Sequence, residues 1–363
     1  MPVRFSHICS VAVLLVGLLC GCGGADDRGW TIRTGALSLT ETLRLAEEND
    51  FYFGQIYDVA VRSDGRLYVA DGEASHLTVV APDGTPQDTI GRPGNGPGKF
   101  RRPFRLAFMN TDSLYVMDGR RVSVFTPAGE FRYSFLAQGA TGAPRNMMVP
   151  SEGGGAFFAY LPLPEQVAET GVRATVRHLG SNGEVGDTLF AVRPRQASPK
   201  GVPLPFSRLS LFDLGPDGAL HHAWSDSLRV TTYSQTGTRR QRVEIPFDPV
   251  PVSSEERQTV LQDLSNERRA VVPDHMPDTK PAFRHFLVDD EGRYWFGRPT
   301  ADPDSMAWWV ARPDEKQVVT TTLSSSVRPM TVKDGAAYSR ATTTSGAPAL
   351  VRYPIDDESL RCL

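Results

Sequence analysis

The chain has 363 residues, of which 40% are hydrophobic and 22% charged, and its formal net charge is −3. This composition is that of a folded protein and excludes a chain that is disordered throughout. The slightly acidic balance gives no basic field of the kind that binds nucleic acid, so we expect no nucleic-acid partner. The 33 glycines and 28 prolines predict many tight turns.

The first 22 residues have the pattern of an export signal. Residues 8–21 form an apolar run that is too short to span a bilayer comfortably. The run leads into Leu19-Cys20-Gly21-Cys22, which resembles the bacterial lipobox. The resemblance implies cleavage before Cys22 and lipidation of its thiol. Cys20 fits less well, because Leu19 stands where a small residue is wanted. An ordinary secretory signal with incidental cysteines is the alternative.

This interpretation divides the start of the chain into a lipoprotein signal peptide, residues 1–21, and a lipidated tether, residues 22–40. Besides Cys22, the mature chain would keep only Cys362, so the fold needs no internal disulfide. We expect the membrane to be a partner through the N-terminal lipid. The expected location is the cell envelope, at the outer membrane or a periplasmic membrane face.

Residues 56–332 contain about six copies of one strand–turn–strand pattern. The clearest pair is "GRLYVADGEASHLTVVAPDG", residues 65–84, and the looser "TDSLYVMDGRRVSVFTPAG", residues 111–129. Runs such as "AFFAY" are apolar at every position, which indicates that both faces of the sheet are covered. A small antiparallel sheet covered on both faces by its own copies is a propeller blade. We therefore expect an all-β fold, a six-bladed β-propeller of four-stranded antiparallel blades over residues 41–357, followed by a tail, residues 358–363.

Closure of the ring should use the beginning of the chain. The last copy supplies only three strands, at about residues 328–332, 336–341 and 348–353. The segment "ETLRLA", residues 41–46, has no partner in the first copy. We predict that it is the outermost strand of the last blade, which leaves no long free edge.

The residues of the first copy resemble an NHL-type repeat. Ser75-His76-Leu77 stands at the position of the family's name motif, after Val69-Ala70-Asp71. Residues 91–103 are similar to the Gly-Pro-Gly-Glu-Phe linker of bacterial six-bladed propeller lipoproteins, with Lys99 in place of the glutamate. The resemblance implies a six-bladed propeller. It implies no single activity, because this fold carries binding proteins, lactonases and lyases.

The glycine-rich linker is not a phosphate-binding loop. A Walker A loop needs Ser or Thr after Gly-Lys, whereas Gly98-Lys99 is followed by Phe100. Pro93 also stands where the first glycine should be. Turn geometry explains these glycines.

Two long gaps between copies mark insertions. Residues 161–172 and 198–207 are proline-bounded loops, and residues 253–275 contain a predicted helical insertion at about 253–272. A capping box begins this helix, and its apolar side is formed by Val260, Leu261 and Leu264. These three segments cover one face of the propeller or, alternatively, form a lid or partner surface over the channel.

Charged residues recur where the innermost strands begin, at the mouth of the central channel. They are Asp58, Arg105, Arg145 with Asn146, Arg208, Arg284 with His285, and Arg328. Converging guanidinium groups favour a carboxylate, sulfate or phosphate. The alternative is that these arginines cap strands and pair with acids such as Asp58. Counted from the turn glycines, Arg105 aligns with Asp58, whereas Arg145, Arg284 and Arg328 fall one residue earlier and Arg208 earlier still. A slip of one residue changes the side to which a strand residue points.

Enzymatic alternatives rest on the same positions. Gluconolactonase-like propellers hold a divalent cation, and Asp58, Asn146 and His285 align as two oxygen donors and one imidazole. These make a poor cage for a hard cation. An NHL-type peptidyl-hydroxyglycine lyase needs several histidines, and only His285 is suitably placed. His221 and His222 follow each other in a strand and should point to opposite faces in packing roles.

The sequence therefore predicts an envelope-anchored module that binds an anionic ligand or an envelope protein, with no catalytic residues, metal or cofactor. The alternative is a metal-dependent hydrolase or lyase with its site in the channel, and a structural scaffold is a third reading.

Overall fold

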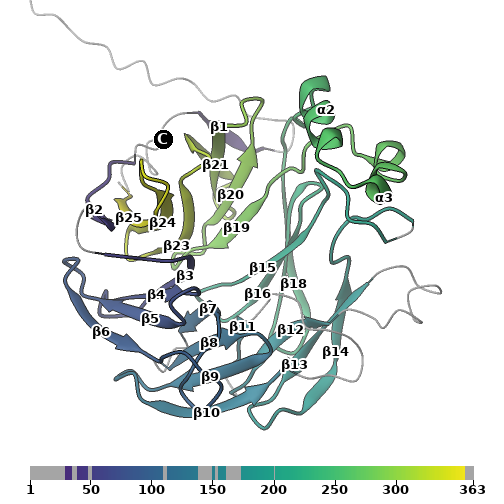
Figure 1. Ribbon diagram of the computed structural model, residues 1–363. Coiled ribbons are helices and arrows are strands. Elements are labelled where there is room, and N and C mark those ends of the chain that lie inside the picture. Colours follow the sequence, from purple (N-terminus) through teal and green to yellow (C-terminus); the bar gives the residue numbers. More distant parts are fainter. Residues whose placement is uncertain are drawn as a thin grey trace, which may run out of the picture.

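The computed structural model describes residues 29–34, 39–47, 51–108, 113–137, 149–151, 154–160, 173–199 and 201–355. Its strands form six sheets that stand around a central axis (Figure 1). The predicted six-bladed β-propeller is therefore confirmed.

Each of the first three blades is formed by four consecutive strands, the innermost named first. Blade one contains β3 (Ile56–Val61), β4 (Leu67–Asp71), β5 (His76–Val80) and β6 (Pro86–Ile90). Blade two contains β7 (Pro103–Phe108), β8 (Leu114–Asp118), β9 (Arg121–Phe125) and β10 (Phe131–Leu136). Blade three contains β11 (Val149–Pro150), β12 (Ala156–Tyr160), β13 (Ala174–Leu179) and β14 (Val185–Val192).

The other three blades include both ends of the propeller. Blade four contains β15 (Ser210–Leu214), β16 (Leu220–Trp224), β17 (Leu228–Tyr233) and β18 (Arg239–Ile245). Blade five contains β19 (His285–Val288), β20 (Tyr294–Pro299), β21 (Ser305–Arg312) and β22 (Gln317–Ser324), with β1 (Thr31–Arg33) added outside β22. Blade six contains β23 (Arg328–Lys333), β24 (Ala336–Thr342), β25 (Pro348–Pro354) and, outermost, β2 (Leu43–Leu45).

The second strands of the first three blades are buried at every position. In β4, β8 and β12 each of the five residues is buried, whereas β6, at the rim, is exposed at four of its five positions. Tyr68 and Leu77 of blade one pack against Leu106, Val116 and Phe125 of blade two in one apolar cluster. Neighbouring blades therefore cover each other's faces, and each fully buried large apolar side chain contributes about 1.5–3 kcal/mol.

The predicted closure is confirmed. β2 pairs with β25 in antiparallel register, with Leu43 opposite Arg352 and Leu45 opposite Leu350. The structure also contains a strand that the sequence did not predict. β1 runs parallel to β22, with Thr31 opposite Gln317.

This extra strand corrects the predicted tether, residues 22–40. Trp30, directly before β1, is only 4% exposed and packs in the apolar cluster of blades four and five. The propeller therefore begins at Trp30. The N-terminal part of the chain adds one strand to each of two adjacent blades, β1 to blade five and β2 to blade six.

The aspartates that end β4 and β8 hold the segments leading into the innermost strands. Asp71 accepts hydrogen bonds from the backbone N–H groups of Gly54 (2.8 Å) and Gln55 (3.1 Å). Asp118 accepts the equivalent bonds from Arg101 and Arg102, both at 2.9 Å. The Asp after Tyr-Val-Ala or Tyr-Val-Met in the repeat is thus a capping residue that fixes where the chain enters the innermost strand of the same blade.

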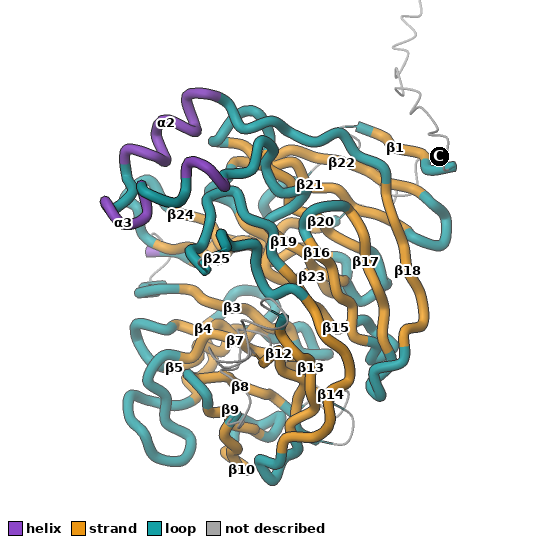
Figure 2. Tube along the Cα trace, turned by 90° about the vertical axis from the view of Figure 1, so that its right-hand side faces the viewer, coloured by secondary structure: helices purple, strands orange, loops and turns teal. Residues whose placement is uncertain are grey.

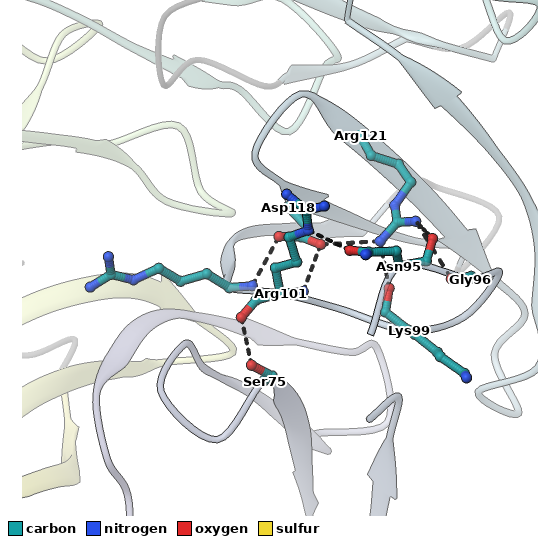
Figure 3. A network of polar contacts seen from close by, with 8 residues as sticks. Ser75, Asn95, Gly96, Lys99, Arg101, Asp118 and Arg121 are labelled. Atoms are coloured by element: carbon teal, nitrogen blue, oxygen red, sulfur yellow. Dashed lines mark hydrogen bonds and ion pairs between the residues drawn. The ribbon is translucent and has the colours of Figure 1, made fainter. Parts of the chain in front are cut away.

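The glycine-rich linker is folded by polar contacts within the protein (Figure 3). The Arg121 guanidinium donates to the carbonyl oxygens of Asn95 and Lys99, both at 2.6 Å, and pairs with Asp118 at 3.2 Å. Ser75 of blade one donates to the Arg101 carbonyl at 2.5 Å. Turn formation therefore accounts for the linker, in line with the exclusion of a phosphate loop.

The helical insertion is broken where the sequence predicted one continuous helix. It contains α2 (Ser254–Gln262), α3 (Asn266–Arg269) and the short 3₁₀ helix η2 (Pro273–His275). Ser253 and Glu256 form the predicted capping box. The break occurs at Ser265, whose backbone is extended and which stands at the N-cap position of the new helix without a side-chain capping hydrogen bond. Serine favours this position over the helix interior.

The insertion lies beside the blades on the outside of the molecule (Figure 2). Leu264 and Val272 form a separate small core with Leu204 of the loop at residues 198–207. Lys280 is 4% exposed and joins the insertion to blade five, with its ammonium 2.5 Å from Glu256 and 2.8 Å from the Thr300 carbonyl. Partial burial alone would raise the pKa of Glu256, but the hydrogen bond and charge of Lys280 lower it.

Candidate functional site

Two cavities follow one another along the central channel. The larger, here called the vestibule, has a volume of about 820 Å³ and lies where the innermost strands begin, beside Arg105, His285 and Arg328. The smaller, the lower cavity, has a volume of about 260 Å³ and lies toward the other end of the strands, beside Asp213 and Asp290. Asp58 and Arg105 line both cavities and therefore mark the boundary between them.

The vestibule brings together most of the predicted site. Asp58, Arg105, Arg284, His285 and Arg328 all line it. Two arginines that the sequence did not single out, Arg102 and Arg195, line it as well. Among the described lining residues there are five arginines and a single carboxylate, that of Asp58.

The predicted slip of one residue is present at Arg284, and both registers reach the same cavity. Asp58, Arg105 and His285 occupy equivalent positions. Each lies three residues before the last residue of its innermost strand that pairs with the second strand of the blade. Arg284 precedes His285 by one residue and still lines the vestibule. Irregular pairing in β3, β7 and β23 bends these strands at their starts. Because arginine side chains are long and the mouth of the vestibule is wide, an arginine one residue out of register still reaches the cavity.

Arg208 has a different place from the other predicted arginines. Its guanidinium donates to the Thr279 carbonyl at 2.9 Å and to the Thr279 hydroxyl at 2.6 Å. Burial lowers the pKa of Arg208, and the residue is not among those that line either cavity. Arg208 thus fastens the segment before blade four to the segment before blade five. The predicted Arg145, Asn146 and lipidated Cys22 lie outside the described residues.

Asp58 and Arg105 form a pair across the first two blades. The Arg105 guanidinium lies 3.8 Å from the Asp58 carboxylate, and the Leu106 N–H donates to the same carboxylate at 2.8 Å. Burial raises the pKa of Asp58, which the charge of Arg105 and the Leu106 N–H oppose. The charge of Asp58 in turn raises the pKa of Arg105. Arg105 keeps a side-chain exposure of 34%, so it remains accessible from the cavity.

His285 is a neutral member of the site. Its ring stacks on Trp308 with the centroids 5.9 Å apart. Burial, together with the charges of Arg328, Arg284 and Arg340, lowers the pKa of His285 to about 3. Burial and the charges of Arg340 and Arg105 also lower the pKa of Arg328. Burial is the larger cause of both shifts, and the neighbouring positive charges add to it in the same direction.

Asp213 is a channel residue that the sequence reasoning missed. Its carboxylate accepts a hydrogen bond from the Val288 N–H at 2.8 Å, which joins blade four to blade five. Burial raises the pKa of Asp213 to about 6, against the opposing charge of Arg105 and the Val288 N–H. A single acidic residue within the apolar run "LSLFDL" was the available signal, because a buried carboxylate needs partners.

The two consecutive histidines of β16 have the predicted packing roles. His221 lies edge-on to Tyr294 at 5.4 Å and hydrogen-bonds Thr232, whereas His222 contacts Phe212 at 4.8 Å and the Ser210 hydroxyl at 2.8 Å. Burial lowers the pKa of each to about 4. The two rings therefore point to opposite faces of the sheet.

The described residues do not assemble a metal site. Within these ranges no group of three or more His, Cys, Asp or Glu side chains converges as metal ligands would. The Asp58 carboxylate faces Arg105, and the His285 ring lies among arginines, which disfavours a second cation. Asn146, the third predicted donor, lies outside the described residues.

Searches against protein-family models and curated proteins found no match. A Bacteroides fragilis protein described as exported is similar in structure, with a TM-score of 0.54, 12% identity, and coverage of 90% of this chain and 100% of that one. A member of the duf4221 family from Bacteroides vulgatus gives a TM-score of 0.51 and 9% identity over 88% of this chain and 98% of that one.

A gluconolactonase from Xanthomonas campestris has a lower TM-score of 0.44 at 15% identity, covering 84% of this chain and 88% of that one. At these identities the likenesses define the fold alone. No helix in the described ranges is long and apolar enough to cross a membrane.

Proposed function

We propose that this protein is a binding module that holds a small anionic ligand in the vestibule. The observation that carries the proposal is the charge of the lining, in which five described arginines face one carboxylate. Guanidinium groups bind carboxylates, sulfates and phosphates through charge-assisted, often bidentate, hydrogen bonds.

The side chains of Arg284 and Arg328 favour a ligand over a purely structural role. Both line the vestibule, and no hydrogen bond or ion pair joins either side chain to another described residue. Arg208 is different, because its guanidinium donates hydrogen bonds to Phe206 and Thr279 within the protein. Arginines that line a cavity without internal partners are suited to an external anion.

Isothermal titration calorimetry tests the proposal. A panel of carboxylates, sulfate and phosphate is titrated into the purified protein and into the Arg284→Ala/Arg328→Ala variant. Each charge-assisted hydrogen bond contributes about 1.5–3 kcal/mol, so the variant should bind at least tenfold more weakly. Arg240→Ala is the matched control, because Arg240 is an exposed arginine that pairs with Asp217 at the other end of the strands. Equal affinity of the double variant and the control would overturn the proposal.

We also propose that the protein is an envelope lipoprotein anchored through Cys22. The signal-like pattern of residues 1–22 supports this, and the structurally similar Bacteroides fragilis protein is described as exported. Thr31 pairs with Gln317, the first residue of β22, at the end of the blade opposite the vestibule. An anchor eight residues before Trp30 would therefore leave the vestibule open on the side away from the attachment point.

A further inference from the structure

The wall of the vestibule is basic on one side and mainly apolar on the other. Arg102, Arg105, Arg284 and Arg328 belong to blades two, five and six or to the segments that lead into them. On the side of blades three and four the described lining of the vestibule is mainly apolar. This apolar arc contains Ala159, Ala174, Val192, Leu209, Leu211 and Phe212, together with Pro194, Ser210 and Arg195.

The apolar arc carries little charge of its own. Among the described residues of this arc, Arg195 is the one charged side chain that lines the vestibule, and its guanidinium donates to the Ser207 hydroxyl at 3.0 Å. Some side chains of the apolar arc are not fully buried in the protein core. Leu209, Leu211 and Phe212 remain partly exposed, so their hydrocarbon surface faces the cavity.

The size of the vestibule agrees with a ligand that contacts both sides. A volume of about 820 Å³ lies within the range of about 300–1,000 Å³ typical of pockets for small organic molecules. An inorganic anion held by the arginines would leave the apolar arc in contact with water. Covering that surface favours binding in proportion to the apolar area removed from water.

From this arrangement we infer that the ligand is an amphipathic organic anion. Its acidic group lies among Arg105, Arg284 and Arg328, and its hydrocarbon part lies against Leu209, Leu211 and Phe212. The inference rests on the proposed function, because it specifies the class of anion that the same cavity takes.

The test is a chain-length series with one acidic group. Acetate, butyrate, hexanoate and octanoate are titrated calorimetrically into the purified protein, with phosphate and 1-octanol as further probes. Burial of each CH₂ group should strengthen binding about two- to fourfold, up to the length that fills the cavity. Leu211→Ser should flatten this dependence. Leu136→Ser is the control, since Leu136 is 46% exposed on the outer strand of blade two.

The outcomes separate the inference from the function on which it rests. If acetate and phosphate bind as tightly as octanoate, and binding needs Arg284 and Arg328, the anion site stands and the amphipathic inference is wrong. If octanol binds as tightly as octanoate and the arginine variant has no effect, the proposed anion site is itself wrong. The wild-type series decides the first point without any variant, so a poorly folded Leu211→Ser protein does not affect it.

Discussion

Replacing Asp71 with alanine tests how the repeat motif shapes the blades. The Asp71 side chain is 1% exposed and accepts four backbone hydrogen bonds, from Gly54, Gln55, Glu73 and Ala74, at 2.8–3.1 Å. A hydrogen bond to a charged group contributes about 1.5–3 kcal/mol, but the four are not additive because a relaxed loop regains water. We expect Asp71→Ala to lower the free energy of unfolding by about 3–5 kcal/mol.

Thermal unfolding followed by circular dichroism measures this effect. For a domain of this size the loss corresponds to a fall in Tm of about 5–10 °C. Asp71→Asn keeps one acceptor oxygen without the charge and should fall between the alanine variant and the wild type. Asp83→Ala is the control, because Asp83 caps one N–H in an exposed turn. If Asp71→Ala melts at the same temperature as the control, the capping role assigned to the motif is wrong.

Three further predictions concern the channel and the N-terminus. Because the folded pKa of Asp213 is about 6, above its ordinary value of 3.8, its ionisation costs stability as pH rises through 6. At pH 7.5 we expect urea unfolding to give Asp213→Asn a free energy of unfolding about 1–2 kcal/mol higher than that of the wild type, after allowance for channel water, and at pH 3.5 we expect the two to be equal. A variant that is less stable than the wild type at pH 7.5 would contradict this. Trp30→Ala should cost about 3–5 kcal/mol in urea unfolding, whereas a free tether predicts no change. Cys22→Ser should abolish palmitate labelling and release the protein from the membrane fraction, while Cys20→Ser should not; persistence of the label in Cys22→Ser would refute lipidation there.

The blades and their closure were predictable because local signals agree with the global fold. The Asp that ends β4 and β8 marks the first two blades, and Gly-containing turns with largely apolar second strands recur along the sequence. The three-stranded last copy also implied that an early strand must complete it. β1 was missed because Thr31–Arg33 has no local signature, and its partner β22 lies far along the chain in parallel register.

The site was only partly predictable, because cavity membership depends on how neighbouring blades are placed. Arg105, Arg284 and Arg328 were found from their position at strand starts. Arg102 and Arg195 lie in connecting segments, whose course depends on capping contacts that the strand pattern does not contain. The same strand-start rule that found Arg105 also included Arg208, which the fold directs toward Thr279 instead.

The apolar arc could not be anticipated either. Leu211 and Phe212 read as ordinary strand residues, and only the partial exposure of their side chains toward the vestibule distinguishes them from core positions. The division of the wall into a basic and an apolar side follows from the order of the blades around the axis rather than from any one repeat.

The most direct test of the central claim is a crystal structure of the protein with 8-bromooctanoate, in which the anomalous signal of bromine locates the end of the chain. The account predicts the carboxylate between Arg284 and Arg328 and the bromine against Leu209 and Leu211 of the neighbouring blade four. Bromine found only on the outer surface, with the vestibule free of ligand at saturating concentration, would contradict it.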